Sequence, residues 1–167
     1  TAPFVDDSNT VLLIHSQAAN NSTSIVDGGA VNTNGSENST VRANAAYGQS
    51  IVSYVGKESA GTTYGHGLNS APELIIVKNL SRSSDWKVYY GDNTDALTLN
   101  TDAATEDQTY YWNDTSPTSS VFTVGAGTDT NGNNENLIAY CFHSVTGYSK
   151  IGSYTGNGST TGPTVTL

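Results

Sequence analysis

Short apolar runs and alternating apolar and polar positions dominate this chain, whereas the spacing typical of an amphipathic helix is hard to find. The pattern predicts strands at residues 11–15, 51–55, 73–78, 86–90, 109–112, 120–124, 137–143 and 150–154. Gly, Asn, Ser, Thr and Asp cluster between these segments and supply turns. The sequence therefore predicts an all-β fold, an antiparallel β-sandwich of jelly-roll, concanavalin-like or immunoglobulin-like type with little or no helix. A short helix is an alternative only at residues 102–107.

Two strands stand out because they are apolar at consecutive positions. Residues 74–78 read Leu-Ile-Ile-Val-Lys, which indicates a central strand that is covered on both faces. Residues 11–15 read Val-Leu-Leu-Ile-His and have the same character. The second of these strands lies ahead of a low-complexity polar stretch that forms either a long surface loop or an irregular strand pair.

A half-repeat links the middle of the chain to its end. Residues 51–68, IVSYVGKESAGTTYGHGL, recur as residues 151–167, IGSYTGNGSTTGPTVTL. The first copy continues into PELIIVKN, while the sequence ends before any equivalent of that strand in the second copy. We therefore predict two regions. Residues 1–44 hold an N-terminal strand, a candidate donor strand, and the polar stretch; residues 45–167 form a sandwich domain that ends in the half-repeat.

Composition and charge limit the classes of partner that the chain is expected to bind. The net charge is −9 and the six Lys and Arg are scattered, which argues against binding to nucleic acid or to an anionic membrane surface. No apolar run has the length of a membrane span. Charged residues make up only 13% of the chain, so its polar surface consists mainly of hydroxyl and amide groups. This composition is typical of extracellular β-proteins and fibres, and the absence of Met fits a processed, exported form or a fragment.

Four motifs carry a family resemblance: ANAAYGQSIVSYVG, TTYGHGLNSAPELIIVKN, YYWNDTSPTSSVFTVG and NLIAYCFHSVTGYSKIGSYTGNGSTTGP. Over residues 43–167 they resemble an uncharacterised β-rich domain of tail-fibre-like structural proteins in the virions of marine and freshwater bacteriophages. The opening FVDDSNTVLLIHSQ is similar to the start of concanavalin-like, laminin-G-like domains. In that family GSYTGNG leads into a further strand, and this chain departs from the pattern at Leu167. The resemblance implies an extracellular structural domain and transfers no catalytic residues.

Candidate catalytic residues are few. His15, His66 and His143 have no zinc-type spacing, so we expect each to be structural. Cys141 lies in an alternating apolar strand and is expected to be a buried small hydrophobe rather than a nucleophile. No G-x-S-x-G motif is present, and the carboxylates are spread over turns, where only the fold could bring a glycosidase pair together. We therefore predict no enzymatic activity and no cofactor.

Two polar turns resemble the start of a calcium loop, at residues 92–95 and 129–136. The second of them has Asn134 and Tyr140 where an EF-hand loop needs Gly and the closing Glu. A plain polar turn is the expected structure at both places, and Ca²⁺ is an alternative.

Aromatic residues at 89–90 and 110–112 suggest a carbohydrate-binding adhesin module as the alternative function, with Trp112 or Tyr110 as the exposed platform. Adjacent residues of a strand point to opposite faces, so only one of each pair would be outward.

N-x-S/T sequons are frequent. The predicted glycosylation sites are Asn20, Asn21, Asn34, Asn38, Asn79, Asn113 and Asn157. They mark a sugar-coated surface if the host has a suitable transferase; otherwise they reflect the abundance of Asn, Ser and Thr.

The sequence favours a non-enzymatic structural subunit of an extracellular fibre, which assembles with copies of itself by strand addition. In this hypothesis Val11, Leu12, Leu13 and Ile14 of one subunit fill a groove beside the C-terminal half-repeat of the next. The acceptor region is Ile151, Tyr154, Val165 and Leu167. Such a contact is heterologous and gives a helical homopolymer. An intramolecular strand at the same place is the alternative.

Overall fold

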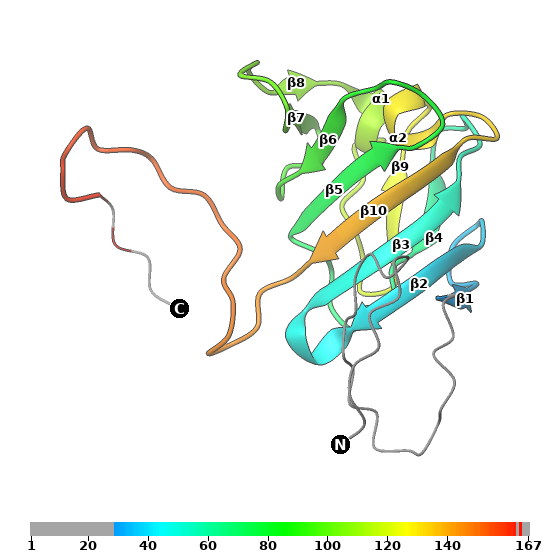
Figure 1. Cartoon of the computed structure of the whole chain (residues 1–167), viewed down its shortest axis with the longest axis horizontal. Coiled ribbons are helices and arrows are strands. Elements are labelled where there is room, and N and C mark those ends of the chain that lie inside the picture. The colour runs from blue at the N-terminus through cyan, green and yellow to red at the C-terminus, as the bar shows by residue number, and fades with distance from the viewer. Residues whose placement is uncertain (1–28, 163, 165–167) are drawn as a thin grey trace, which may run out of the picture.

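A computed structural model describes residues 29–162 and residue 164, and in these residues the chain is a two-layered β-structure (Figure 1). An eight-stranded antiparallel sheet has the order β1-β2-β3-β10-β5-β6-β7-β8, and a two-stranded sheet pairs β4 with β9. The strands are β1 (Ala30–Asn32), β2 (Ser39–Asn44), β3 (Gln49–Val55), β4 (Thr62–Gly65), β5 (Leu74–Asn79), β6 (Trp86–Tyr89), β7 (Asp95–Thr98), β8 (Glu106–Asp107), β9 (Val121–Val124) and β10 (Asn136–Phe142). The helices are η1 (Ala45–Tyr47), α1 (Thr109–Trp112) and α2 (Thr128–Asn131). The predicted all-β sandwich class is confirmed.

Strand β10 is the centre of the large sheet, because it pairs with β3 on one side and with β5 on the other. Its residues alternate as a strand requires: Leu137, Ala139 and Cys141 are fully buried, while the residues between them are only partly covered. Strand β5 alternates in the same way, with Ile75 and Val77 buried. The predicted central position of β5 is confirmed. Among the described residues the second layer covers one face of β5, and the outward Leu74, Ile76 and Lys78 are half-buried, so coverage on both faces stays a prediction.

Aromatic side chains fill the space between the two sheets. The rings of Tyr54 and Tyr64 lie 4.1 Å apart between centroids, and Phe122 packs edge-on against Tyr54 at 5.7 Å. At the other end of the core the ring of Tyr89 meets Trp112 at 5.8 Å. The small sheet and helices α1 and α2 thus cover one face of the large sheet, which we call its inner face (Figure 1).

Asn131, the last residue of α2, ties the layers together through all of its amide atoms. Its Oδ1 accepts hydrogen bonds from the Lys57 N–H at 2.8 Å and from the Tyr64 hydroxyl at 3.3 Å. Its Nδ2 donates to the carbonyl oxygens of Ser59 at 3.0 Å and Gly125 at 2.7 Å. Because the side chain is fully buried, these four bonds satisfy an amide that water cannot reach.

Residues 109–112, predicted as a strand, are instead the short helix α1. The helix ends at Asn113, which has a left-handed conformation with φ of 55°. Gly125 allows this close packing, since a Cβ there would lie 2.5 Å from the carbonyl oxygen of Thr109. The alternative helix at residues 102–107 is also wrong, because β8 occupies Glu106–Asp107. These local choices depend on packing against distant residues that the period-2 pattern does not record.

The polar stretch is partly strand. Strands β1 and β2 form an antiparallel pair, and β2 also pairs with β3, so residues 30–32 and 39–44 belong to the large sheet. The predicted strands at 51–55, 73–78, 86–90, 120–124 and 137–143 correspond to β3, β5, β6, β9 and β10. The predicted strand at 150–154 is wrong, because these residues have no regular structure. The predicted strand at 11–15 lies outside the described residues.

Replacing Asn131 with Asp tests the bond network between the layers. The substitution turns two donated hydrogen bonds into contacts between oxygen atoms and places a carboxyl group in the core. We expect a loss of about 3 kcal/mol or more in the free energy of unfolding, measured by urea denaturation. Asn133→Asp is the matched control, because Asn133 is exposed in the adjacent turn. Equal denaturation midpoints for the two variants would contradict the role given to Asn131.

Candidate functional site

The face of the large sheet that points away from the second layer, its outer face, carries a continuous apolar row. Ile51 of β3 pairs with Tyr140 of β10, and Tyr140 pairs with Ile76 of β5. Ile76 in turn pairs with Val88 of β6, which pairs with Leu97 of β7. Because paired residues lie on the same side of a sheet, these side chains form one row across five adjacent strands.

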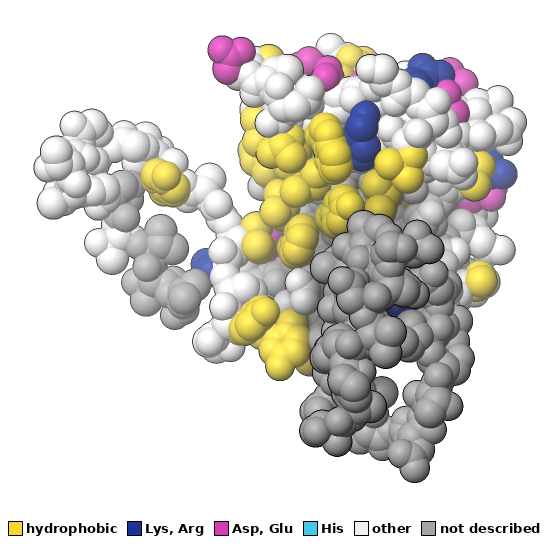
Figure 2. Space-filling view, viewed as in Figure 1, with side chains coloured by type: hydrophobic (Ala, Val, Ile, Leu, Met, Phe, Trp, Pro, Cys, Tyr) yellow, Lys and Arg dark blue, Asp and Glu magenta, His cyan; other side chains and the backbone are white. Residues whose placement is uncertain are grey.

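Further apolar side chains widen this row. Strand β10 places Ile138 and Phe142 on either side of Tyr140, and Trp86 lies on β6 two positions from Val88. Figure 2 shows the resulting group of hydrophobic side chains on the face that Figure 1 presents to the viewer. No described helix or strand packs over it, since β4, β9, α1 and α2 lie on the inner face. Along the row Ile51 is 37% exposed, Tyr140, Ile76 and Leu97 are half-buried, and Val88 is 5% exposed.

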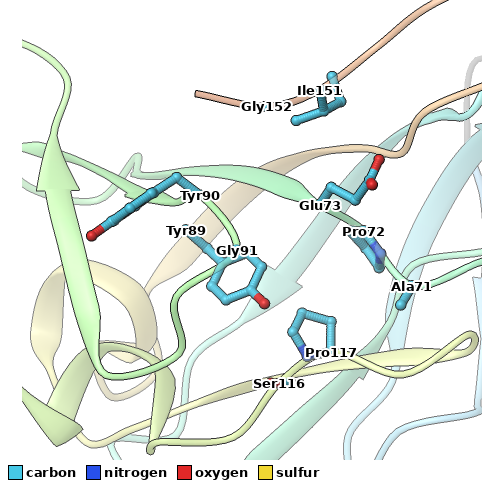
Figure 3. Close-up of a pocket in the computed structure, with 10 residues that line it drawn as sticks. All are labelled: Ala71, Pro72, Glu73, Tyr89, Tyr90, Gly91, Ser116, Pro117, Ile151 and Gly152. Atoms are coloured by element: carbon cyan, nitrogen blue, oxygen red, sulfur yellow. The ribbon is translucent and has the colours of Figure 1, made fainter. Parts of the chain in front are cut away.

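A shallow open hollow of about 400 Å³ lies at one end of the large sheet (Figure 3). It is lined by Ala71, Pro72, Glu73, Tyr89, Tyr90, Gly91, Ser116, Pro117, Ile151 and Gly152. The Glu73 carboxylate accepts a hydrogen bond from Ser144, which holds the pKa of Glu73 below its usual value. The hollow therefore has an aromatic and proline-rich wall with one ionised carboxylate.

Of the two described residues of the predicted acceptor region, one contacts the body of the protein. Ile151 is half-buried at the hollow, and its N–H donates to the Ser144 hydroxyl at 2.9 Å. Tyr154 is 71% exposed, whereas Tyr54, its counterpart in the first copy of the half-repeat, is 3% exposed. Val165 and Leu167 lie outside the described residues, as do Val11, Leu12, Leu13 and Ile14. The described residues therefore place Ile151 beside a hollow and leave Tyr154 in solvent.

The two described histidines have structural partners. The His66 Nε2 lies 3.1 Å from the carbonyl oxygen of Thr118, and its Nδ1 accepts from the Leu68 N–H. This arrangement fixes a neutral ring, and burial lowers the pKa of His66 further. His143 Nδ1 lies 2.8 Å from the carbonyl oxygen of Ser144. His15 lies outside the part of the chain that the structure describes.

Among the described residues, nucleophiles and metal ligands do not come together in one site. Cys141 is fully buried, and burial raises its pKa to about 12, so the reactive thiolate is scarce at neutral pH. Among the described residues, no group of three or more His, Cys, Asp or Glu side chains is placed to hold a metal ion. The calcium-like residues take other roles: Glu135 pairs with Arg82 at 2.6 Å, and Asp92 accepts the hydroxyl of Thr94 at 2.7 Å.

A buried cationic cluster, which the sequence did not reveal, joins β6, β7, β8 and α1. The Lys87 ammonium donates to the Thr98 hydroxyl at 2.8 Å, lies 3.5 Å from the Glu106 carboxylate and sits 4.5 Å from the centre of the Tyr111 ring. The Tyr111 hydroxyl donates to Glu106 at 2.6 Å, and this bond is the main cause of the lowered pKa of Glu106. Both charged groups of the cluster, Lys87 and Glu106, have partners, which indicates a structural rather than a catalytic role.

The aromatic platform predicted for sugar binding is largely internal. Trp112 is 1% exposed and packs against Tyr89, so its predicted role as an exposed platform is wrong. The reason is that residues 109–112 are helical, which turns both Tyr111 and Trp112 into the core. Tyr110 is 40% exposed and stacks edge-on against Tyr111. The hydroxyl of Tyr90 lies 3.3 Å from an Asp95 carboxylate oxygen.

The described sequons differ in accessibility. Asn34, Asn38 and Asn157 are exposed, and Asn113 is half-buried at the end of α1. Asn79 is fully buried, and its Nδ2 donates to the Thr128 carbonyl oxygen at 2.9 Å and to Glu135. The folded chain therefore offers no room for a glycan at Asn79. The predicted sites Asn20 and Asn21 lie outside the described residues.

Comparisons with known proteins give one match. Residues 13–166 match a protein family described as Domain of unknown function (DUF7483). No curated protein matches the chain. No solved structure matches it either. In the described part of the chain, no helix has the length and apolar character needed to cross a membrane.

The fall in thermal stability between neutral pH and about pH 3 tests the cluster around Lys87. Folding lowers the pKa of Glu106 from its ordinary value of 4.5, so its contribution to stability is present above that pH and is lost as the pH falls through the folded value. Glu106→Gln should therefore lose less stability than the parent chain when thermal unfolding is followed from neutral pH down to about pH 3. Asp107→Asn, one residue along β8 and exposed, is the control. An identical fall in thermal stability for Glu106→Gln and the parent would refute the coupling.

Proposed function

The chain belongs to the DUF7483 family, whose function is unknown, and from that premise we propose that it is a non-enzymatic structural subunit of an extracellular fibre or filament. Subunits of this kind assemble with copies of themselves, and the fibre is either a phage appendage or a cell-surface fibril. The low share of charged residues, 13%, supports a setting outside the cell, since a surface of hydroxyl and amide groups is common in fibres.

The outer apolar face of the large sheet is the observation that carries this proposal. Apolar side chains that gather on one face of a folded protein often mark a contact with another protein. A row that crosses five strands, from Ile51 to Leu97, is suited to contact with another layer of protein. A catalytic role has less support, because the described histidines and Cys141 are engaged in the core.

Segment 11–14 of one subunit is proposed to bind the next subunit, and we call this contact the joint. A donated segment of four apolar residues contributes about 1.5–3 kcal/mol per side chain before the ordering costs are subtracted. The donor and acceptor surfaces are different patches of the same chain, so each subunit gives one segment and receives another. A heterologous contact that does not close on itself repeats along a helix, which is the geometry of a filament.

A carbohydrate-binding module is the second candidate, and the hollow in Figure 3 is the observation in its favour. The half-buried Pro117 in its wall offers apolar surface to a sugar ring, and the exposed Glu73 carboxylate offers a hydrogen-bond acceptor. Glycan-array binding that is lost on Glu73→Gln and kept on Tyr110→Ala would support this hollow as the site. Binding lost only with Tyr110→Ala would place the sugar on the exposed ring beside α1, and no binding at all would remove the candidate.

Removing residues 1–16 tests the assembly directly. We expect the shortened chain to stay folded and monomeric, because β1 to β10 remain intact while the joint is missing. Electron microscopy and light scattering then report filaments for the full chain and particles of monomer size for the deletion. Leu12→Asn with Leu13→Asn should have the same effect, whereas Asn20→Gln with Asn21→Gln is the matched control within the same region. Filaments that persist after the deletion would refute the joint.

A further inference from the structure

We infer that the outer apolar face of the large sheet is the docking surface for segment 11–14 of a neighbouring copy, which lies on this face as a second layer. The inference rests on the proposed function and specifies the surface that receives the segment. It differs from the addition of a strand at a sheet edge, which uses main-chain hydrogen bonds rather than the apolar side chains of a face.

The edges of the large sheet are poor templates for a donated strand. One edge strand, β1, has three residues, and the other, β8, has two. Short edge strands limit the number of main-chain hydrogen bonds that an added strand can form, and they are a common protection against edge pairing. The small sheet consists of two four-residue strands, and its buried side chains already fill the core. A donated strand therefore finds short edges to pair with, whereas the outer face presents apolar side chains from five adjacent strands.

The dimensions of the face suit the segment. A four-residue extended segment spans about 13 Å, and the three outward residues of β10 from Ile138 to Phe142 cover about the same length. Layers of strands pack about 10 Å apart, which leaves room for one layer of interdigitating side chains. Alternate residues of the segment would therefore face the row formed by Ile51, Tyr140 and Ile76.

Charge and chain path favour this segment as the occupant. Two of the six Lys and Arg of the chain, Lys78 and Arg42, lie on outward positions of β5 and β2 beside the apolar row. Asp6 and Asp7 precede the segment and are separated from it by three residues, 8–10. The outer face also carries Asp95 and its pair Asp107, but at the far end, on β7 and β8. Asp6 and Asp7 ahead of the segment are therefore opposite in charge to Lys78 and Arg42, which lie beside the apolar row of the acceptor.

The described chain begins beside this face. A Cβ at Gly29 would lie 2.9 Å from the methyl carbon of Thr40, an outward-facing residue of β2. The segment is connected to that point by about fourteen residues, which reach at most about 50 Å when extended. This length spans the face of a neighbour packed alongside, and it also spans the subunit's own face. The test must therefore tell exchange between copies from docking within one copy.

Cysteine cross-linking of assembled full-length chains makes that distinction. Leu13→Cys protein is mixed with Ile76→Cys protein, assembled and oxidised, and the products are separated under denaturing conditions. The native Cys141 is fully buried and contributes little background. We expect dimers at about tenfold the yield of the control mixture of Leu13→Cys with Asn133→Cys, because docking raises the local concentration of the paired thiols. Ile138→Cys replaces Ile76→Cys if the latter fails to fold.

The outcomes separate the inference from the proposed function. A cross-link that forms only within the double variant Leu13→Cys with Ile76→Cys, and never in the mixture, overturns exchange between copies and the proposed joint with it. Filaments without any cross-link to Ile76 or Ile138 overturn the outer face as the docking surface and leave the filament proposal standing. As an independent readout, Ile76→Lys should abolish filaments in a chain that keeps its thermal unfolding transition, whereas Asn133→Lys should not.

Discussion

Burial of the inner face of the large sheet against the aromatic layer of Tyr64, Phe122 and Trp112 is the constraint on which the rest of the structure depends. It places one set of alternating residues in the core and necessarily turns the other set outward. Along β10 and β5 the outward set is also apolar, so packing one face creates the need to cover the other. The filament proposal follows from this geometry rather than from any reactive group.

The confirmed predictions are those that depend on the local pattern of apolar and polar residues. Alternation along residues 51–55 and 137–143 requires a strand with one buried face, and the fully apolar run in β5 indicates a central strand. Coverage on both faces could not be decided from that run, because an apolar outward face is the same in sequence whether it meets its own chain or a neighbour. Residues 109–112 became helical because Gly125 and Gly127 let the backbone approach closely, and that contact crosses loops that no local pattern describes.

The internal residues that matter most have partners far away in the sequence. Asn131 bonds to a carbonyl 72 residues away, and Lys87 reaches Glu106 across 19 residues. In sequence both residues resemble ordinary polar turn or strand positions. The half-repeat supports the same conclusion: Tyr54 and Tyr154 share Ser before them and Gly two positions after them, yet among the described residues only Tyr54 has β2 and β10 beside it. Strand formation in this chain therefore depends on partners more than on local sequence.

Electron cryo-microscopy of the assembled full-length chain tests the central claim most directly. The account predicts helical filaments in which an extended segment with the side chains of residues 11–14 lies over β10 and β5 of the adjacent subunit. An outer face left open to solvent in the filament, or covered by the segment of the same subunit, would contradict it.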